Sequence, residues 1–142
     1  MYRFIYPTKD TYIYELNDNS DKNFGGDDTL VLKKDFDGLT GLNAVSRVLL
    51  EFNFSELSQS LVTNEITNPK YYLRLYEKKT SELSPIYSLT AFPLSQSWEE
   101  GTGYKNQNPN SRDGVSWEKR NENFQHLSWS FIGSSDFNQE SG

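Results

Sequence analysis

Apolar and polar side chains alternate along residues 47–54, in the clearest pattern of the chain. One face of this segment would carry Val48, Leu50, Phe52 and Phe54. The other face would carry Arg47, Leu49, Glu51 and Asn53. Because successive side chains of a strand point to opposite faces, this period of two predicts a strand with its back in a core.

The same alternation returns in residues 70–77. Tyr71, Leu73 and Leu75 fall on one face, and the opposite face takes the positions between them. This segment is therefore predicted to be a second long strand. We expect the apolar rows of the two segments to line one interior shared between two sheets.

Shorter runs rich in β-branched and aromatic residues are bounded by proline, glycine or polar clusters. They predict strands over residues 3–6, 10–15, 29–33, 87–92, 115–117 and 127–132. The stretch 35–43 is predicted to be a loop, and Ser55 is predicted to cap a single helical turn over 55–58. The expected fold is all-β: an antiparallel β-sandwich resembling a jelly roll, with its completeness at the C-terminus left open.

The length of 142 residues is that of one ordinary domain. We predict a single β-sandwich domain over residues 1–133. Residues 134–142 are predicted to be a flexible tail or the start of a continuation.

The net charge of −6 and the lack of cysteine narrow the possible functions. A nucleic-acid partner would require a basic face, and an anionic membrane would repel this chain, so we expect neither partner. Disulfides and thiolate-bound metals are excluded. No apolar run approaches the roughly 20 residues of a membrane-spanning helix.

Catalytic residues are not evident in the sequence. His126 is the single histidine, and Ser128 lies two positions away, a spacing that rarely forms a catalytic triad. Glu99 and Glu100 are adjacent, whereas glycoside hydrolysis needs two carboxyl groups facing each other across a sugar. We predict a protein that is not an enzyme and has no catalytic residue and no bound cofactor.

Acidic residues gather around a Gly-Gly turn. They are Asp18, Asp21, Asp27 and Asp28. Oxygen-rich loops of this kind bind calcium, but the spacing does not match the EF-hand pattern. A structural calcium ion is therefore the less favoured alternative, and a solvated loop is the favoured one.

Aromatic side chains accumulate in the loop-rich second half. The candidates for stacking on sugar rings or anchoring a protein interface are Trp98, Tyr104, Trp117 and Trp129. The favoured interpretation, however, is that these rings pack beneath the loops at one end of the sandwich.

Seven short motifs occur in a characteristic order. They are DTYI (10–13), NFGG (23–26), TLVL (29–32), SRVLLEF (46–52), YLRLY (72–76), WEEGTG (98–103) and GVSW (114–117). In this order the chain resembles the DNRLRE-type β-sandwich domains of secreted cell-surface proteins and tailed-phage structural proteins, most closely the phage versions. The resemblance implies a jelly-roll-like sandwich without catalytic residues. It also implies further strands after residue 133, which a longer product or strand addition from a partner could supply.

Two functions follow from this resemblance. The leading hypothesis is a virion structural protein in a neck, tail, fibre or capsid-decoration role, present in many copies and contacting other virion proteins through loops and strand edges. The alternative is a carbohydrate-binding module of a secreted or cell-surface protein, since some relatives bind acidic polysaccharides. A basic patch for such a ligand would draw on Lys33, Lys34, Arg47, Arg74, Lys78 and Lys79.

Overall fold

The computed structural model describes most of the chain. The described residues are 2–15, 19–36, 38, 41, 43–78, 88–108, 110–123 and 126–129. The predicted tail at 134–142 lies outside them, so the predicted domain limits stay a prediction. Within this part of the chain, no helix has the length and apolarity needed to cross a bilayer.

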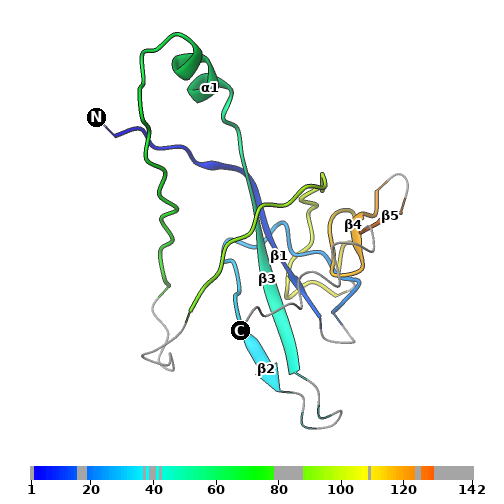
Figure 1. Ribbon diagram of the computed structural model, residues 1–142. Helices are drawn as coiled ribbons and strands as arrows, with labels where there is room; N and C mark the ends of the chain where they lie inside the picture. Colours follow the sequence, from blue (N-terminus) through cyan, green and yellow to red (C-terminus); the bar gives the residue numbers. More distant parts are fainter. Residues whose placement is uncertain are drawn as a thin grey trace.

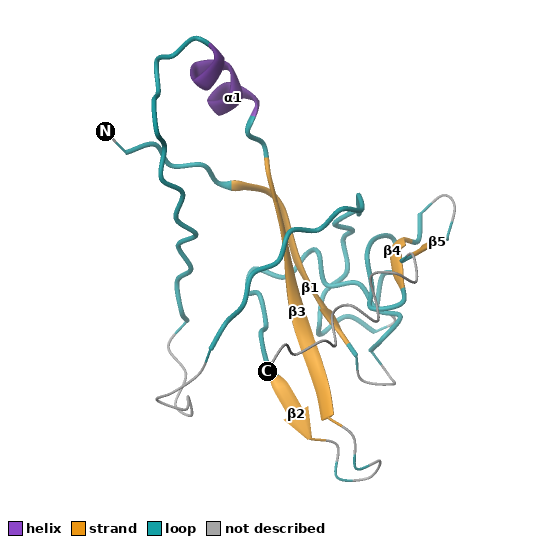
Figure 2. Ribbon diagram, in the orientation of Figure 1, coloured by secondary structure: helices purple, strands orange, loops and turns teal. Residues whose placement is uncertain are grey.

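Antiparallel strands form the framework (Figures 1 and 2). The elements, in chain order, are β1 (Pro7–Tyr14), β2 (Lys34–Phe36), β3 (Asn43–Phe52), α1 (Ser55–Val62), β4 (Lys119–Asn121) and β5 (Leu127–Ser128). A three-stranded sheet has the order β1-β3-β2, and β4 pairs with β5 in a two-stranded sheet. The all-β antiparallel prediction is confirmed.

The β1–β3 pair is the central element of the fold. Tyr12 lies opposite Val48, and the register holds from Lys9 to Tyr14, with an irregularity between Pro7 and Lys9. Pro7 begins this strand, although the sequence suggested that it would end one over residues 3–6. A proline is tolerated at the first position of a strand because few ladder hydrogen bonds are lost there.

Side chains pack against both faces of this strand pair. On one face Tyr12, Tyr14, Phe24 and Ala44 form a buried cluster, which Val48 joins. On the other face Ile13, Trp98 and Val115 form a second cluster, against which Leu49 packs. The predicted strand over 47–54 is therefore confirmed from Arg47 to Phe52, where β3 ends, but it is covered on both faces rather than on one.

Several of the predicted strands differ from the structure. Residues 29–33 are not a strand, and β2 runs from Lys34 to Phe36, so that its last two residues fall inside the predicted loop. In the predicted strand 115–117, Val115 and Ser116 are buried and Trp117 is partly buried, but the backbone is irregular, and the strand β4 begins only at Lys119. The prediction over 127–132 is confirmed at β5, and its remainder from residue 130 lies outside the described residues. In each case the sequence identified an apolar segment correctly. Whether that segment forms a strand depends on a neighbouring strand that can hydrogen-bond to it.

The prediction for residues 70–77 was wrong. The chain there has no assigned strand, and Tyr71, Leu73 and Leu75 face solvent. The described part of 87–92 is likewise exposed and irregular. Alternation of apolar and polar side chains indicates that a segment could line a core as a strand. The segment forms that strand only where a neighbouring strand pairs with it.

The helix is longer than predicted. It runs for eight residues, and Phe54 rather than Ser55 occupies the N-cap position. The Asn53 side-chain oxygen accepts a hydrogen bond from the Ser55 N–H at 2.9 Å, and this bond turns the chain from β3 into α1.

Candidate functional site

A single buried asparagine joins the loops at one end of the β1–β3 pair. The Asn23 side-chain amide donates to the carbonyls of Glu100 and Val115, at 2.6 and 2.8 Å. Its oxygen accepts from the N–H groups of Gly25 and Gly103, at 3.1 and 2.8 Å. All four hydrogen-bonding positions of the amide are used, so three separate loops are held in one arrangement.

Glycine is required where these loops converge. A Cβ atom on Gly25 would lie 2.1 Å from the carbonyl oxygen of Glu100, and one on Gly114 would lie 2.5 Å from the Cα of Gly101. Gly101 also has a φ of +78°, which other residues rarely adopt. The NFGG, WEEGTG and DGVSW segments thus form a close-packed support for the exposed loops. We refer to the region that contains them, the described residues 19–28, 98–108 and 110–123, as the loop face.

Tyr104 is the most exposed aromatic residue of the loop face. Its ring lies against Gly26, whose added Cβ would be 2.6 Å from the ring carbon Cζ. Its backbone is fixed by the Asn110 side chain, which donates to the Tyr104 carbonyl at 2.8 Å. With 51% of its surface exposed, Tyr104 offers ring area on a supported backbone.

Asp27 holds the two loops around Tyr104 together. Its carboxylate accepts from the Tyr12 hydroxyl at 2.8 Å and from the Lys105 N–H at 3.1 Å. Burial of the Tyr12 ring, together with this bond to a carboxylate, raises the pKa of Tyr12 well above its ordinary value. Tyr12 therefore stays protonated and continues to donate.

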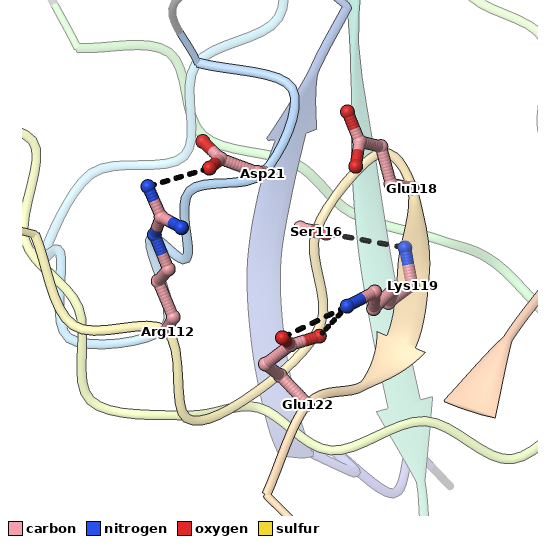
Figure 3. Close-up of a pocket in the computed structure, with 6 residues that line it drawn as sticks. All are labelled: Asp21, Arg112, Ser116, Glu118, Lys119 and Glu122. Atoms are coloured by element: carbon pink, nitrogen blue, oxygen red, sulfur yellow. Dashed lines mark hydrogen bonds and ion pairs between the residues drawn. The ribbon is translucent and has the colours of Figure 1, made fainter. Parts of the chain in front are cut away.

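A charged cleft of about 110 Å³ lies on the same loop face (Figure 3). It is lined by Asp21, Arg112, Ser116, Glu118, Lys119 and Glu122. Figure 3 shows two ion pairs: Arg112 reaches Asp21 at 2.6 Å, and Lys119 reaches Glu122 at 2.7 Å. Carboxylates accept hydrogen bonds, and ammonium and guanidinium groups donate them, so the cleft offers both kinds of polar partner.

In and near the cleft, the neighbours of two carboxyl groups favour the ionised form. The Lys119 ammonium, helped by His126, holds the pKa of Glu122 below its usual range. Nearby, burial alone would raise the pKa of Asp113, but hydrogen bonds from the Thr102 hydroxyl and N–H outweigh it and lower that pKa. Both carboxylates are therefore ionised at neutral pH and brace the loops by charge-assisted bonds.

The three tryptophan candidates are less accessible than Tyr104. Trp98 is 4% exposed and packs with Ile13 and Val115. Trp117 is partly buried beneath the Arg47 guanidinium, which lies 4.6 Å from its ring centroid. Trp129 donates its indole N–H to the Ser116 carbonyl at 3.0 Å. These rings pack beneath the loops, which leaves Tyr104 as the candidate for stacking.

The acidic candidates for calcium have separate partners. Asp21 pairs with Arg112, Asp27 binds Tyr12 and Lys105, and Asp28 is exposed, while Asp18 lies outside the described residues. Among the residues that are described, no three acidic or histidine side chains gather as metal ligands do. The calcium ion, the less favoured alternative from the sequence, therefore stays untested.

The remaining reactive candidates serve structural contacts. Glu100 accepts from the Asp10 N–H at 2.7 Å, Glu99 lies 3.7 Å from the Lys9 ammonium, and exposed His126 contacts Glu122 at 3.1 Å. Members of the proposed basic patch have separate partners: Lys33 pairs with Asp35, Arg47 covers Trp117, and Arg74 lies over Phe4. Lys79 lies outside the described residues.

A comparison with protein-family models decides the family. The model for carbohydrate-binding module family 96 matches residues 2–127. The chain belongs to carbohydrate-binding module family 96. No curated protein and no solved structure matches it. The loop face, with Asn23, Tyr104 and the charged cleft, lies within the matched residues of this family 96 module.

Membership of family 96 supports some of the hypotheses drawn from the sequence and not others. A carbohydrate-binding module is a non-catalytic domain, which agrees with the prediction that the chain is not an enzyme. Neither a DNRLRE family nor a phage family matches, so the virion interpretation gains no support and the carbohydrate-binding alternative is favoured.

Sequence reasoning missed two parts of this site. Asn23 was noted within the NFGG motif, but the hydrogen bonds by which its side chain connects three loops were not predicted. The cleft residues Arg112, Lys119 and Glu122 carried no motif, and only their proximity in the folded chain identifies them. A signal for Asn23 was present, because an asparagine before Phe-Gly-Gly, among glycine-rich loops, suggests a side chain that bonds the backbone.

Proposed function

We propose that this family 96 module binds a polysaccharide through its loop face, outside the cell or at a cell surface, and does no chemistry on it. The observation that carries this proposal is the half-exposed ring of Tyr104 held on Gly26. The same loops also carry a cleft of paired charges. Aromatic rings with charged and polar neighbours suit sugars, which present both apolar ring faces and hydroxyl groups.

Binding would use two kinds of contact. The Tyr104 ring would stack on the apolar face of one sugar unit, and the cleft would exchange hydrogen bonds with hydroxyl groups of another. Arg112 and Lys119 would donate, and Asp21 and Glu122 would accept. Because Asn23 and the glycines hold the loops in place before binding, little ordering cost would oppose the ligand.

A virion structural role is the second candidate from the sequence. No observation on the loop face favours it over sugar binding, and no phage family matches. Sugar binding is therefore the function to test first.

The test is affinity electrophoresis of the purified chain in gels that contain a panel of neutral, acidic and amino polysaccharides, followed by calorimetry on the best ligand. We expect retardation by at least one polysaccharide. Replacement of Tyr104 by alanine should weaken binding about tenfold or more, which corresponds to roughly 1.4 kcal/mol.

Tyr2→Ala is the matched control. Tyr2 is 89% exposed, and Figure 1 shows the N-terminus of the chain far from β4 on the loop face. The loss of the Tyr2 ring should therefore leave binding unchanged. Circular dichroism of both variants checks that folding is preserved. Absence of binding to the whole panel, or equal binding by Tyr104→Ala and the unaltered chain, would refute the proposal.

A further inference from the structure

Residues 70–78 have the sequence pattern of a core strand but lie in solvent. We call this segment the arm. Along it Tyr71, Leu73 and Leu75 alternate with Tyr72, Arg74 and Tyr76, and every residue of the arm is exposed. Contiguous apolar surface of this kind usually marks an interaction site on a soluble protein.

The backbone of the arm is unpaired within the described residues. None of the backbone hydrogen bonds found there involves residues 70–78. Side chains of the arm approach the body of the protein at three places. Tyr71 lines an apolar pocket with Leu57 and Leu61 of α1. The Arg74 guanidinium lies 5.8 Å from the Phe4 ring centroid, and Lys78 reaches the Thr29 hydroxyl at 3.4 Å. The arm otherwise runs apart from the three-stranded sheet (Figure 2).

The three-stranded sheet has an edge that the arm could fit. β1 pairs with β3 as far as Phe52, but β2 pairs with β3 only from Asn43 to Val45. Beyond Ser46, whose N–H bonds the Lys33 carbonyl, no described strand covers the β2 side of β3. We call Val48–Phe52 on this side the open edge. An uncovered edge is a template for an added strand, and its length matches the apolar part of the arm.

Charge also favours this pairing. The arm carries three cations, Lys70, Arg74 and Lys78, against one carboxylate, Glu77, in a chain whose net charge is −6. The open edge includes Glu51, which lies 3.6 Å from the Lys9 ammonium and whose side chain stays partly exposed. A positive arm is therefore attracted to the acidic body of a neighbouring molecule, while two bodies without arms would repel each other.

We propose that two copies of this chain form a symmetric dimer in which each arm adds as a strand to the open edge of the other copy. Each molecule presents both parts, so a twofold arrangement satisfies both contacts and closes the assembly. The two exchanged arms would bury the apolar rows that the single chain leaves in water. This proposal does not depend on the chain binding sugar.

Sedimentation equilibrium of the unaltered chain over a wide concentration range tests the proposal. We expect a mass that approaches twice the 16.4 kDa of one chain as concentration rises. Leu73→Pro should hold the mass at that of one chain, because proline removes a backbone N–H and obstructs a ladder. Since Leu73 is exposed and outside any strand, the variant should still fold.

Leu89→Pro is the matched control. Leu89 is 54% exposed against 53% for Leu73, and it also lies outside any strand, so this variant should dimerise like the unaltered chain. A chain that stays monomeric at every concentration, or a dimer that survives Leu73→Pro, overturns the proposal.

Hydrogen exchange provides a second measurement without a substitution. The amides of residues 71–76 should be protected at high concentration and exchange rapidly on dilution. Concentration-independent exchange of these amides would contradict arm exchange even if the chain dimerises by another surface.

Discussion

The side-chain amide of Asn23 donates a hydrogen bond to the backbone carbonyl of Val115 at 2.8 Å, across 92 positions of sequence. Val115 itself is fully buried against Ile13 and Trp98. The bond therefore couples the loop face to the core, so that the position of Tyr104 and the charged cleft depends on the stability of the fold beneath them.

Asn23→Ala should lower the free energy of unfolding by about 2–4 kcal/mol. The change leaves buried carbonyl and N–H groups of three loops without partners, and each such loss costs about 1–3 kcal/mol before relaxation. Urea denaturation followed by tryptophan fluorescence measures it. Exposed Asn106→Ala is the control and should change stability by less than about 0.5 kcal/mol. Equal stability of the two variants would show that the hydrogen bonds of the Asn23 side chain do not stabilise the fold.

Gly26→Ala should weaken sugar binding with little loss of stability. The added methyl group would meet the Tyr104 ring, and because that ring is half exposed it can swing aside rather than unfold the loop. Calorimetry on the ligand found by electrophoresis measures the effect. Gly38→Ala, where a Cβ meets nothing within 4 Å, is the control. Unchanged affinity in Gly26→Ala would mean that the ring position does not govern binding.

Trp98→Ala should destabilise the protein by about 3–5 kcal/mol, because a buried indole leaves a large cavity. Any loss of sugar binding should then track unfolding and recover under stabilising conditions, whereas the loss in Tyr104→Ala should not. Thermal unfolding and binding measured on the same samples separate the two effects. A stable Trp98→Ala variant with no affinity would place Trp98 in the binding site instead.

Acid should weaken the charged cleft. Because the pKa of Glu122 is lowered in the folded chain, its contribution to stability is present above the ordinary glutamate pKa of about 4.3 and is lost as pH falls through the lowered folded value. We expect Glu122→Gln to cost less than about 1 kcal/mol at pH 6 and nothing near pH 2. Denaturant unfolding at the two pH values measures the difference. A cost that persists undiminished at pH 2 would exclude the ion pair with Lys119 as its source.

The sequence by itself determined the class of the fold and the two strands at its centre. Period-two alternation around Val48 and the β-forming run at Tyr12 depend only on neighbouring residues, and both became strands. It also predicted the aromatic candidates, among which Tyr104 remains accessible. These inferences held because side-chain direction along a strand is a local property.

Only the tertiary structure decided which candidates are accessible and which segments pair. Trp98 and Tyr104 both lie in loops of the sequence, yet one is core and the other half exposed, since burial depends on what packs above each ring. Leu73 and Leu50 occupy equivalent positions in their patterns, but only Leu50 has a strand beside it. Asn23, Arg112 and Glu122 became a joint and a cleft through contacts between distant loops, and alternation along the chain carries no information about such contacts.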